Sequence, residues 1–539
     1  MKAPSPRVAA SDLLDDLQRV KQIHHLPDRF PADVEAAAAH ADPTHARWLA
    51  SATRVDLTDV EFVTLDPAGS RDLDQAFFLR RDADGSWTLR YAIADVAAFV
   101  EPGGPIDLEA WRRIVTVYLP GARVALHPPS MSEGTASLLA GQTRAAVVWT
   151  MRLDADAKLL DATVQRAWVR SRVALDYDSA QRDLAQGRAS EPIRLLADFG
   201  RLRRERERER GGASLQLPSQ EINVVDSGYE LSWRIPLVIE DDNAQLSLLT
   251  GMTAASLALG GGWAVLRTLP APPDFAVDRL RKVARTLSIP WGENQRYGDV
   301  LAQLDRSSRA AVAFMNQAAR LFRGAGYHCV RPDRNERGPN QNGRAEPGPN
   351  QNGWAEPGPN QNGRAEPGPS QRDAAAEVPM IHAAMAAPYS HVTAPLRRMG
   401  DRYATEVALS VVAGREPPEW VTARLDDLPG AMQAGLRVDS AVERSVTDAI
   451  EAALFEPLIG RELPAFVVNR AERGVVVVFD HPPAEALARG DNSELGAPVR
   501  VRVDAVDVAL WRTSLSIVAH NSPGEKTRPP RPNKPKGSS

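Results

Sequence analysis

The chain contains 539 residues, with 65 Lys and Arg against 69 Asp and Glu and a hydrophobic content of 43%. This length exceeds what one hydrophobic core organises and predicts about two to four domains. The near-neutral charge excludes a uniformly basic chain, so any surface for nucleic acid must be local. Cys329 is the single cysteine, which excludes an internal disulfide framework and a cysteine-rich zinc site.

The first region, 1–58, is predicted to be a helical N-terminal domain. Ser11 and Asp12 can cap a first helix, and Pro31 can open a second. Helices are expected over 13–20, 32–40 and 45–53. Three short helices with basic residues could form a helix-turn-helix, and a plain helical cap on the next domain is the alternative.

An acidic cluster follows, at the point where the pattern changes to strands. Strands are expected over 61–65, 76–80 and 87–94, the last two joined by a hairpin turn at 82–85. Asp66, Asp72 and Asp74 lie between the first two strands. Carboxylates crowded beside an apolar sheet repel one another unless a cation lies between them, and oxygen ligands without Cys or His select Mg²⁺ or Mn²⁺. The cluster therefore predicts a metal site, with a polar loop at a hairpin as the alternative.

The middle of the chain alternates between strands and helices. Strands are expected over 145–152 and 162–171, and helices over 195–210, 243–259, 277–287 and 310–322. The segment 203–210 alternates Arg and Glu. This charge run could contact phosphates, but its mixed signs favour a solvated helix face with ion pairs along it.

Residues 338–367 repeat one decapeptide three times, Gly-Pro-Asn-Gln-Asn-Gly-Arg/Trp-Ala-Glu-Pro. A repeat this rich in Pro, Gly and Asn cannot build a core. We therefore predict a disordered insertion over 336–376, inside a domain that extends over 59–457.

A second polar segment follows the insertion. Arg397 and Arg398 come after a proline turn, with Thr393, His391 and Tyr389 upstream, and this pattern predicts a phosphate clamp. A single histidine such as His391 is more typical of a hydrogen-bonded structural residue.

The C-terminal part changes from helices to strands. Helical sequence is expected over 419–458, then strands over 462–469, 474–479, 499–506 and 514–518. Short strands with glycine-rich turns predict a small oligonucleotide-binding (OB) β-barrel over 458–520. The tail, 521–539, is basic and proline-rich, and it is expected to be disordered and to make weak contacts with polyanions.

Together these motifs resemble the ribonuclease II / ribonuclease R (RNB) family of processive 3′-to-5′ exoribonucleases. The family signature D-x5-D-x-D-D-A reads Asp66, then Asp72-Leu73-Asp74-Gln75-Ala76, and Ile93-Ala94-Asp95-Val96 follows it. The second signature, T-S-P-I-R-R-Y-x-D, is matched by residues 393–401, and two further family segments by 117–120 and 137–141. The region after Gly460 is similar to an S1 RNA-binding domain.

The resemblance implies an α+β multidomain protein, with an RNB catalytic fold of a mixed sheet surrounded by helices and a C-terminal S1-like OB barrel. It implies that Asp66, Asp72 and Asp74, with Gln75 beside them, hold a catalytic Mg²⁺, or Mn²⁺ in its place. Asp74 and Arg397 would be catalytic, Arg397 at the scissile phosphate. The residues implied to contact RNA are Tyr118, His391, Thr393, Arg397 and Arg398.

Three departures from the family pattern qualify this interpretation. Gln75 stands where the family has a fourth acid, the helix at 243–248 lacks the family's acidic residues, and no pair of cold-shock domains precedes the acidic cluster. The leading hypothesis is a hydrolytic exoribonuclease that releases nucleoside 5′-monophosphates. The alternatives are an RNA-binding protein with weakened or lost catalysis and a specialised 3′-end trimming nuclease.

The expected partner is the 3′ end of single-stranded RNA, bound by a monomer. The sequence shows no apolar run of the roughly 18 residues that span a bilayer and no apolar core of a signal peptide. We therefore expect a cytoplasmic protein without membrane contacts.

Overall fold

The computed structural model describes residues 7–8, 10–49, 53–215, 217–225, 228–306, 308–332, 380–490 and 493–520. The predicted insertion over 336–376 and the basic tail over 521–539 lie outside the described residues. No helix in the described ranges combines the length and apolar character needed to cross a membrane.

The N-terminal region contains two of the three expected helices, α1 (Ala10–Ile23) and α2 (Ala32–Ala39). The third expected helix, over 45–53, is wrong in its described part. Asp42 accepts hydrogen bonds from the Thr44 backbone N–H and hydroxyl, which caps a 3-10 turn at Pro43–His45, and 46–49 continue without helix. The two helices pack against different elements, α1 against α12 (Leu428–Phe455) and α2 against α3 (Pro105–Arg113).

The first barrel is a closed five-stranded sheet. Its strands are β2 (Val55–Asp66), β3 (Gln75–Arg81), β4 (Trp87–Ala94), β7 (Thr143–Leu153) and β8 (Leu159–Asp176), in the order β2-β3-β4-β7-β8. Strands β2 and β8 are parallel and the other pairs are antiparallel, so the sheet is mixed as predicted. The expected hairpin turn is confirmed, with Gly85 at φ +84° in a conformation that favours glycine.

Apolar side chains alternate between the two faces of this barrel. Phe77, Tyr91 and Trp149 belong to one buried cluster, which also takes in the covering helices. Ala76, Ala92 and Val148, each next to one of them in the chain, belong to the other. This period of two follows from the pleat of the strands.

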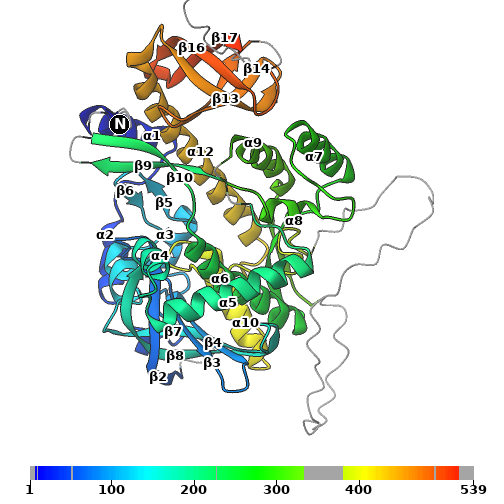
Figure 1. Ribbon diagram of the computed structural model, residues 1–539. Helices are drawn as coiled ribbons and strands as arrows, with labels where there is room; N and C mark the ends of the chain where they lie inside the picture. Colours follow the sequence, from blue (N-terminus) through cyan, green and yellow to red (C-terminus); the bar gives the residue numbers. More distant parts are fainter. Residues whose placement is uncertain are drawn as a thin grey trace, which may run out of the picture.

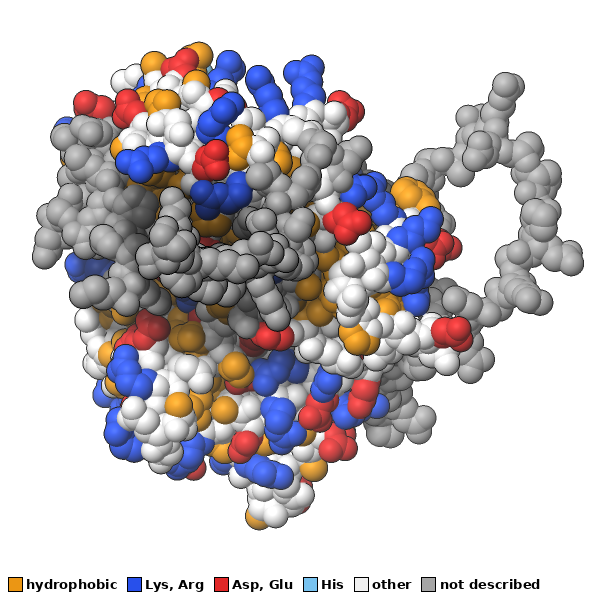
Figure 2. Space-filling view, turned by 45° about the horizontal axis from the view of Figure 1, so that its top comes forward, with side chains coloured by type: hydrophobic (Ala, Val, Ile, Leu, Met, Phe, Trp, Pro, Cys, Tyr) orange, Lys and Arg blue, Asp and Glu red, His pale blue; other side chains and the backbone are white. Residues whose placement is uncertain are grey.

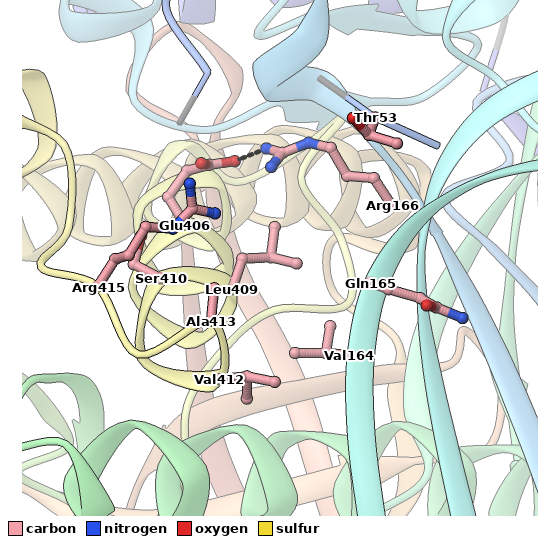
Figure 3. A pocket seen from close by; sticks show the side chains of 10 residues that line it. All are labelled: Thr53, Val164, Gln165, Arg166, Glu406, Leu409, Ser410, Val412, Ala413 and Arg415. Atoms are coloured by element: carbon pink, nitrogen blue, oxygen red, sulfur yellow. Dashed lines mark hydrogen bonds and ion pairs between the residues drawn. The ribbon is translucent and has the colours of Figure 1, made fainter. Parts of the chain in front are cut away.

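Helices cover one side of the barrel (Figure 1). They include α4 (Tyr177–Ala185), α5 (Glu191–Arg210), α6 (Val238–Gly260) and α10 (Met399–Val412). Helix α6 packs against α4, α5 and α10. Helix α10 also packs against β8, and the ion pair of Arg166 with Glu406 is part of the lining of a 170 Å³ cavity between them (Figure 3).

The expectation of a solvated face for the charge run of α5 is wrong on one side of the helix. Arg203 and Glu207 are buried, and Arg203 donates a 2.7 Å hydrogen bond to the Ala157 carbonyl. Gly200 allows the close approach of α6, since a Cβ there would lie 2.3 Å from Asp242 Oδ1. The alternation of signs did not reveal which face is covered.

A helical subdomain follows, made of α7 (Asp274–Thr286), α8 (Tyr297–Ala302) and α9 (Arg309–Ala318). It has its own core, which includes Leu280, Val283 and Phe314. The hairpin of β11 (Ala264–Thr268) and β12 (Gly326–Val330) flanks it. Helix α9 ends earlier than expected, and 319–322 form a 3-10 turn.

The C-terminal part is a second closed barrel, at the top of Figure 1. Its strands are β13 (Glu462–Ala471), β14 (Gly474–Phe479), β15 (Ala484–Arg489), β16 (Pro498–Asp507) and β17 (Arg512–His520). The four expected strands are confirmed, and β15 was missed because its sequence has no β-branched or aromatic residue. Helix α12 leads into this barrel, and Phe455 at its end lies in the barrel core.

Short elements complete the described chain. They are α11 (Glu419–Thr422) and the strands β1 (Arg7–Val8), β5 (Val117–Leu119), β6 (Ala122–Val124), β9 (Ser219–Val225) and β10 (Gly228–Arg234). Trp233 of β10 donates a 2.9 Å hydrogen bond to the Phe479 carbonyl, which ties the second barrel to the rest. On the face shown in Figure 2, basic and acidic side chains are interspersed, in keeping with the near-neutral charge.

Candidate active site

The loop between β2 and β3 carries the predicted acidic cluster. Gly69, at φ +82°, lies in its turn, where the Ser70 N–H bonds to the Pro67 carbonyl. The Ser137 hydroxyl donates to the Arg71 carbonyl and accepts the Leu73 N–H. These bonds fix the backbone of the loop, so the acids are held on a rigid support.

Asp74 joins the two signature segments. The residue is 3% exposed, and its Oδ1 accepts a 2.7 Å hydrogen bond from the Leu396 N–H. Its Oδ2 lies 3.4 Å from Arg397 Nε. Burial raises the pKa of Asp74 to about 8, although Arg397 opposes this shift. Residues far apart in the sequence therefore meet at one carboxylate.

Asp66, the last residue of β2, has a buried oxygen without a hydrogen-bond partner. Among the described residues, nothing donates to its Oδ2. Burial raises the pKa of Asp66 to about 6, while Arg397 lowers it and Asp72 raises it further. An unsatisfied buried carboxylate oxygen is unfavourable, so this atom is a candidate contact for a cation or a ligand.

Asp72 is placed differently from the other two acids. Its Oδ1 lies 2.9 Å from Arg123 Nη1, and its Oδ2 accepts a 3.2 Å hydrogen bond from the Tyr118 hydroxyl. Arg123 also pairs with Glu133. A protein cation thus already compensates Asp72, and this carboxylate holds Tyr118 beside the site.

Gln75 begins β3, next to Asp74. Its Oε1 accepts a hydrogen bond from the Tyr91 hydroxyl on the neighbouring strand β4. Burial raises the pKa of Tyr91 well above its ordinary value, so the phenol stays protonated and donates. The amide that replaces the family's fourth acid is therefore held by a neutral neighbour.

Arg397 and Tyr118 are the exposed members of the site. The Arg397 side chain is 45% exposed and Tyr118 is 49% exposed. The Thr116 N–H donates to the Arg397 carbonyl, and the Met399 N–H to the Ile114 carbonyl, each at 3.0 Å. These backbone bonds join the segment of Tyr118 to the segment of Arg397. The guanidinium of Arg397 and the ring of Tyr118 are both accessible to a ligand.

The other predicted RNA contacts lie in the support behind Arg397. Arg398 makes an ion pair with Asp401 at 2.8 Å, and Thr393 is buried with its hydroxyl 2.8 Å from that of Ser247. His391 Nδ1 lies 2.7 Å from the Tyr327 hydroxyl, and burial holds the pKa of His391 well below its usual range. A role for these three side chains in RNA contact stays a prediction.

Sequence reasoning missed several polar neighbours of the acids. Asn243 of α6 donates hydrogen bonds to the Tyr177 hydroxyl at 2.9 Å and to the Leu65 carbonyl at 3.4 Å. Tyr91 had a local signal, because its position in β4 puts it opposite Phe77 and near Gln75. Asn243, Tyr177 and Arg123 come from distant elements and had none.

The donor set fits a hard cation in its chemistry. Asp66 and Asp74 offer carboxylate oxygens, and Gln75 offers a carbonyl, the ligand types that Mg²⁺ and Mn²⁺ prefer. The partnerless Asp66 oxygen and the raised pKa of both acids mark charges that a cation would stabilise. Within the described ranges, no three His, Cys, Asp or Glu side chains are grouped as a metal site, and Asp72 is paired with Arg123.

The fold and the site define a two-barrel protein in which acids of one segment meet an arginine of another. Comparison with protein families identifies it further: the RNB domain matches residues 54–410, and the RNase II-type exonuclease C-terminal S1 domain matches residues 461–518. The chain belongs to the RNB family. The resemblance found in the sequence and the predicted fold class are confirmed.

Curated relatives match parts of the chain. An uncharacterized ribonuclease of Synechocystis is 28% identical over 269 residues, which cover 49% of this chain and 39% of that protein. Exoribonuclease 2 of Edwardsiella piscicida is 40% identical over 136 residues, 25% of this chain and 21% of that protein. The matches therefore span less than half of the length of these relatives.

Solved structures share the fold at low sequence identity. Mycoplasma genitalium RNase R, in complex with ribose-methylated single-stranded RNA, has a TM-score of 0.76 at 18% identity, covering 94% of this chain and 78% of that one. Yeast Ssd1, described as a pseudonuclease, has a TM-score of 0.63 at 16% identity, covering 91% of this chain and 57% of that one. The same fold thus occurs in proteins with and without nuclease activity.

Proposed function

We propose that this protein is a metal-dependent exoribonuclease that hydrolyses RNA processively from its 3′ end and releases nucleoside 5′-monophosphates. The observation that carries the proposal is the convergence of Asp66, Asp74 and Arg397 from two distant segments. Membership of the RNB family and the C-terminal S1 domain support it.

A divalent cation would be held by Asp66 and Asp74, with the Gln75 carbonyl as a further oxygen. When bound, Mg²⁺ supplies an activated water and stabilises charge on the leaving oxygen. Arg397 is steadied on one side by Asp74 and exposed on the other, so its guanidinium can bind the phosphoryl oxygens as their charge develops.

Tyr118 would hold the base at the 3′ end of the RNA. Its ring is half-exposed, and the bond from its hydroxyl to Asp72 fixes its orientation. Stacking on an aromatic ring contributes about 1–3 kcal/mol per base and tolerates every base. This tolerance suits an enzyme that removes nucleotides one after another.

The second candidate function is RNA binding with weakened or lost catalysis. Two of the four signature positions offer no free carboxylate, because Gln75 is an amide bonded to Tyr91 and Asp72 is paired with Arg123. The third hypothesis is a specialised 3′-end trimming nuclease. Its chemistry would be the same, and it would differ in the position on the RNA at which hydrolysis ends.

The test follows a 5′-labelled RNA with a single-stranded 3′ tail, incubated with the full chain and Mg²⁺, then with Mn²⁺, then with a chelator. The proposal predicts metal-dependent release of mononucleotides and, because digestion is processive, conversion of the full-length labelled strand to a short end product with few intermediates. RNA binding without any mononucleotide release in either metal would overturn it in favour of the second function. Release that stops at one fixed distance from a duplex would identify a trimming nuclease.

A further inference from the structure

The charge run of α5 faces a cavity that the proposed active site does not use. This cavity has a volume of 410 Å³ and is lined by residues of α5, α6, α8 and α9. Helix α6 separates it from the site: Asn243 and Ser247 make the site contacts, whereas Ala244, Gln245 and Leu248 line the cavity. The two places are therefore distinct.

Arginines dominate the charged lining of the cavity. Four arginines, Arg201, Arg204, Arg208 and Arg306, stand against two acids, Glu207 and Asp241. Burial lowers the pKa of Arg204; the neighbouring Asp241 and Glu207 oppose this shift, and Arg306 and Arg208 add to it. Arg201, Arg204 and Arg306 are each paired with an acid, Glu205, Asp242 and Asp241 respectively, so an anion would find its cation at Arg208.

The acids of the cavity are already bonded. Asp241 Oδ2 lies 3.2 Å from both Nη atoms of Arg306, and Arg204 pairs with the buried Asp242. Glu207 accepts hydrogen bonds from Ser214 at 2.5 Å and from Gln245 at 2.8 Å. The exposed Arg208 guanidinium, by contrast, makes no hydrogen bond or ion pair among the described residues. It is the cation most available to a ligand.

Apolar side chains, Leu248, Leu301 and Met315 among them, make up much of the remaining lining, beside the polar Ser214 and Gln245. A volume of 410 Å³ is within the range of sites for small ligands, about 300–1,000 Å³. Guanidinium groups bind phosphate oxygens in a planar, bidentate way. An arginine rim beside apolar walls therefore matches a ligand with a phosphate at one end and a flat apolar group at the other.

We propose that this cavity binds a nucleoside 5′-monophosphate, with the phosphate against Arg208 and Arg204 and the base against the apolar walls. The proposal goes beyond the proposed hydrolysis, because binding here needs neither the metal nor the acids at Asp66 and Asp74. It also assigns a function to Arg204 and Arg208, which lie outside the buried face of α5 that contains Arg203.

The test is calorimetric titration of the full chain with AMP, adenosine or inorganic phosphate, in the absence of divalent metal. An Arg397→Ala background removes phosphate binding at the candidate active site. In that background, Arg208→Glu should weaken AMP binding about tenfold or more, since it replaces a charge-assisted contact with repulsion. The matched control is Arg188→Glu, an exposed arginine that pairs with Asp183 outside the cavity lining.

A second variant tests the apolar part of the cavity. Ala244 is exposed toward the cavity, so Ala244→Leu should fill the base position without overpacking the core. AMP affinity should then fall about fivefold toward that of inorganic phosphate, because the base loses its apolar contacts. Inorganic phosphate itself should bind as before.

Several outcomes would overturn the proposal. One is AMP binding that disappears with Arg397→Ala but survives Arg208→Glu, which would locate the nucleotide at the other site. Another is equal affinity for AMP, phosphate and adenosine in all variants. A third is a single-stranded oligoribonucleotide that binds in an Arg208-dependent way while AMP does not, which would assign the cavity to an RNA strand. Loss of RNA hydrolysis alone leaves these titrations unchanged.

Discussion

Two groups of buried carboxylates and arginines lie on the first barrel, and their charges are paired to different extents. In one group, Asp95 Oδ2 lies 2.5 Å from Arg54 Nη2 and 2.9 Å from Arg166 Nε, and Arg166 also pairs with Glu406 (Figure 3). All four side chains are almost fully buried. Two acids and two arginines balance one another, so this group holds α10 and the chain before β2 onto the barrel.

The candidate active site uses the same residue types with incomplete pairing. Asp74 and Arg397 are 3.4 Å apart, Arg397 is half-exposed, and an oxygen of Asp66 is buried without a partner. The difference shows that the number of buried charges does not distinguish a structural ion-pair group from a candidate active site. What separates them, among the described residues, is whether each carboxylate has a buried protein cation in direct contact, as Asp95 and Glu406 have and Asp66 does not; a single nitrogen of Arg54 also lacks a hydrogen-bond partner.

The variant Asp74→Asn tests the difference between the two groups most directly, with the largest expected effect. The amide can still accept the Leu396 N–H, but it removes the charge that would hold a metal and steady Arg397. We expect RNA hydrolysis to fall about 10³-fold while RNA affinity stays within a few-fold, as measured by product release and filter binding. Equal losses of binding and hydrolysis would contradict the role of Asp74 in the chemistry.

Arg166→Met should have the opposite effect, lowering the stability of the fold while leaving hydrolysis nearly unchanged. It leaves Glu406 buried without the arginine and Asp95 with Arg54 alone, and breaking a buried pair lowers the free energy of unfolding by about 3–5 kcal/mol. Urea unfolding measures this loss, and hydrolysis per folded molecule should be nearly unchanged. The double variant Arg166→Met/Glu406→Gln should recover part of the stability. A specific fall in hydrolysis at full stability would show that this group is not only a support.

Much of the site was visible in the sequence because its residues are local. Asp66, Asp72 and Asp74 stand in one loop, and Arg397 stands in a second recognisable segment. What local pattern could not give is the partner of each acid. Arg123 lies on β6, so nothing near Asp72 indicated that a protein cation would reach it.

The fold shows the same limit. Strands with clear alternation and capped helices were predicted, but the helix expected over 45–53 was wrong because Asp42 caps a 3-10 turn. In α5 the alternation of Arg and Glu does not distinguish one face of the helix from another. The burial of Arg203 and Glu207 instead follows from the close approach of α6 at Gly200. Tertiary contacts, rather than periodicity, settle such cases.

Another buried carboxylate, on α12, extends the comparison to neutral partners. Glu451 of α12 accepts hydrogen bonds from Gln220 Nε2 at 2.7 Å and from the Glu485 N–H of the second barrel at 3.2 Å. Burial raises the pKa of Glu451 from its ordinary value of 4.5 to about 7. The folded state therefore binds this proton more tightly than the unfolded state.

The sign of the pH effect follows. The stabilising contribution is fully present below pH 4.5 and is lost as the pH rises through about 7. Between pH 5 and pH 8, the free energy of unfolding should fall by about 2 kcal/mol through this group. Glu451→Gln keeps an acceptor for both bonds and should remove that decline in urea titrations. A decline of the same size in the variant would assign the effect to other groups.

The smallest expected effect concerns Tyr118, where the site meets its ligand. Tyr118→Ala removes the ring and should weaken the hold on the last bases by about 1 kcal/mol, the lower part of the range for stacking, because the ring is half-exposed. The final undegraded product should become longer, as read on a sequencing gel of a 5′-labelled RNA. Tyr118→Phe keeps the ring and loses only the bond to Asp72, so it should end at the original length. If both variants lengthen the product equally, the hydroxyl bonded to Asp72 matters more than the ring, and the role given to the ring is wrong.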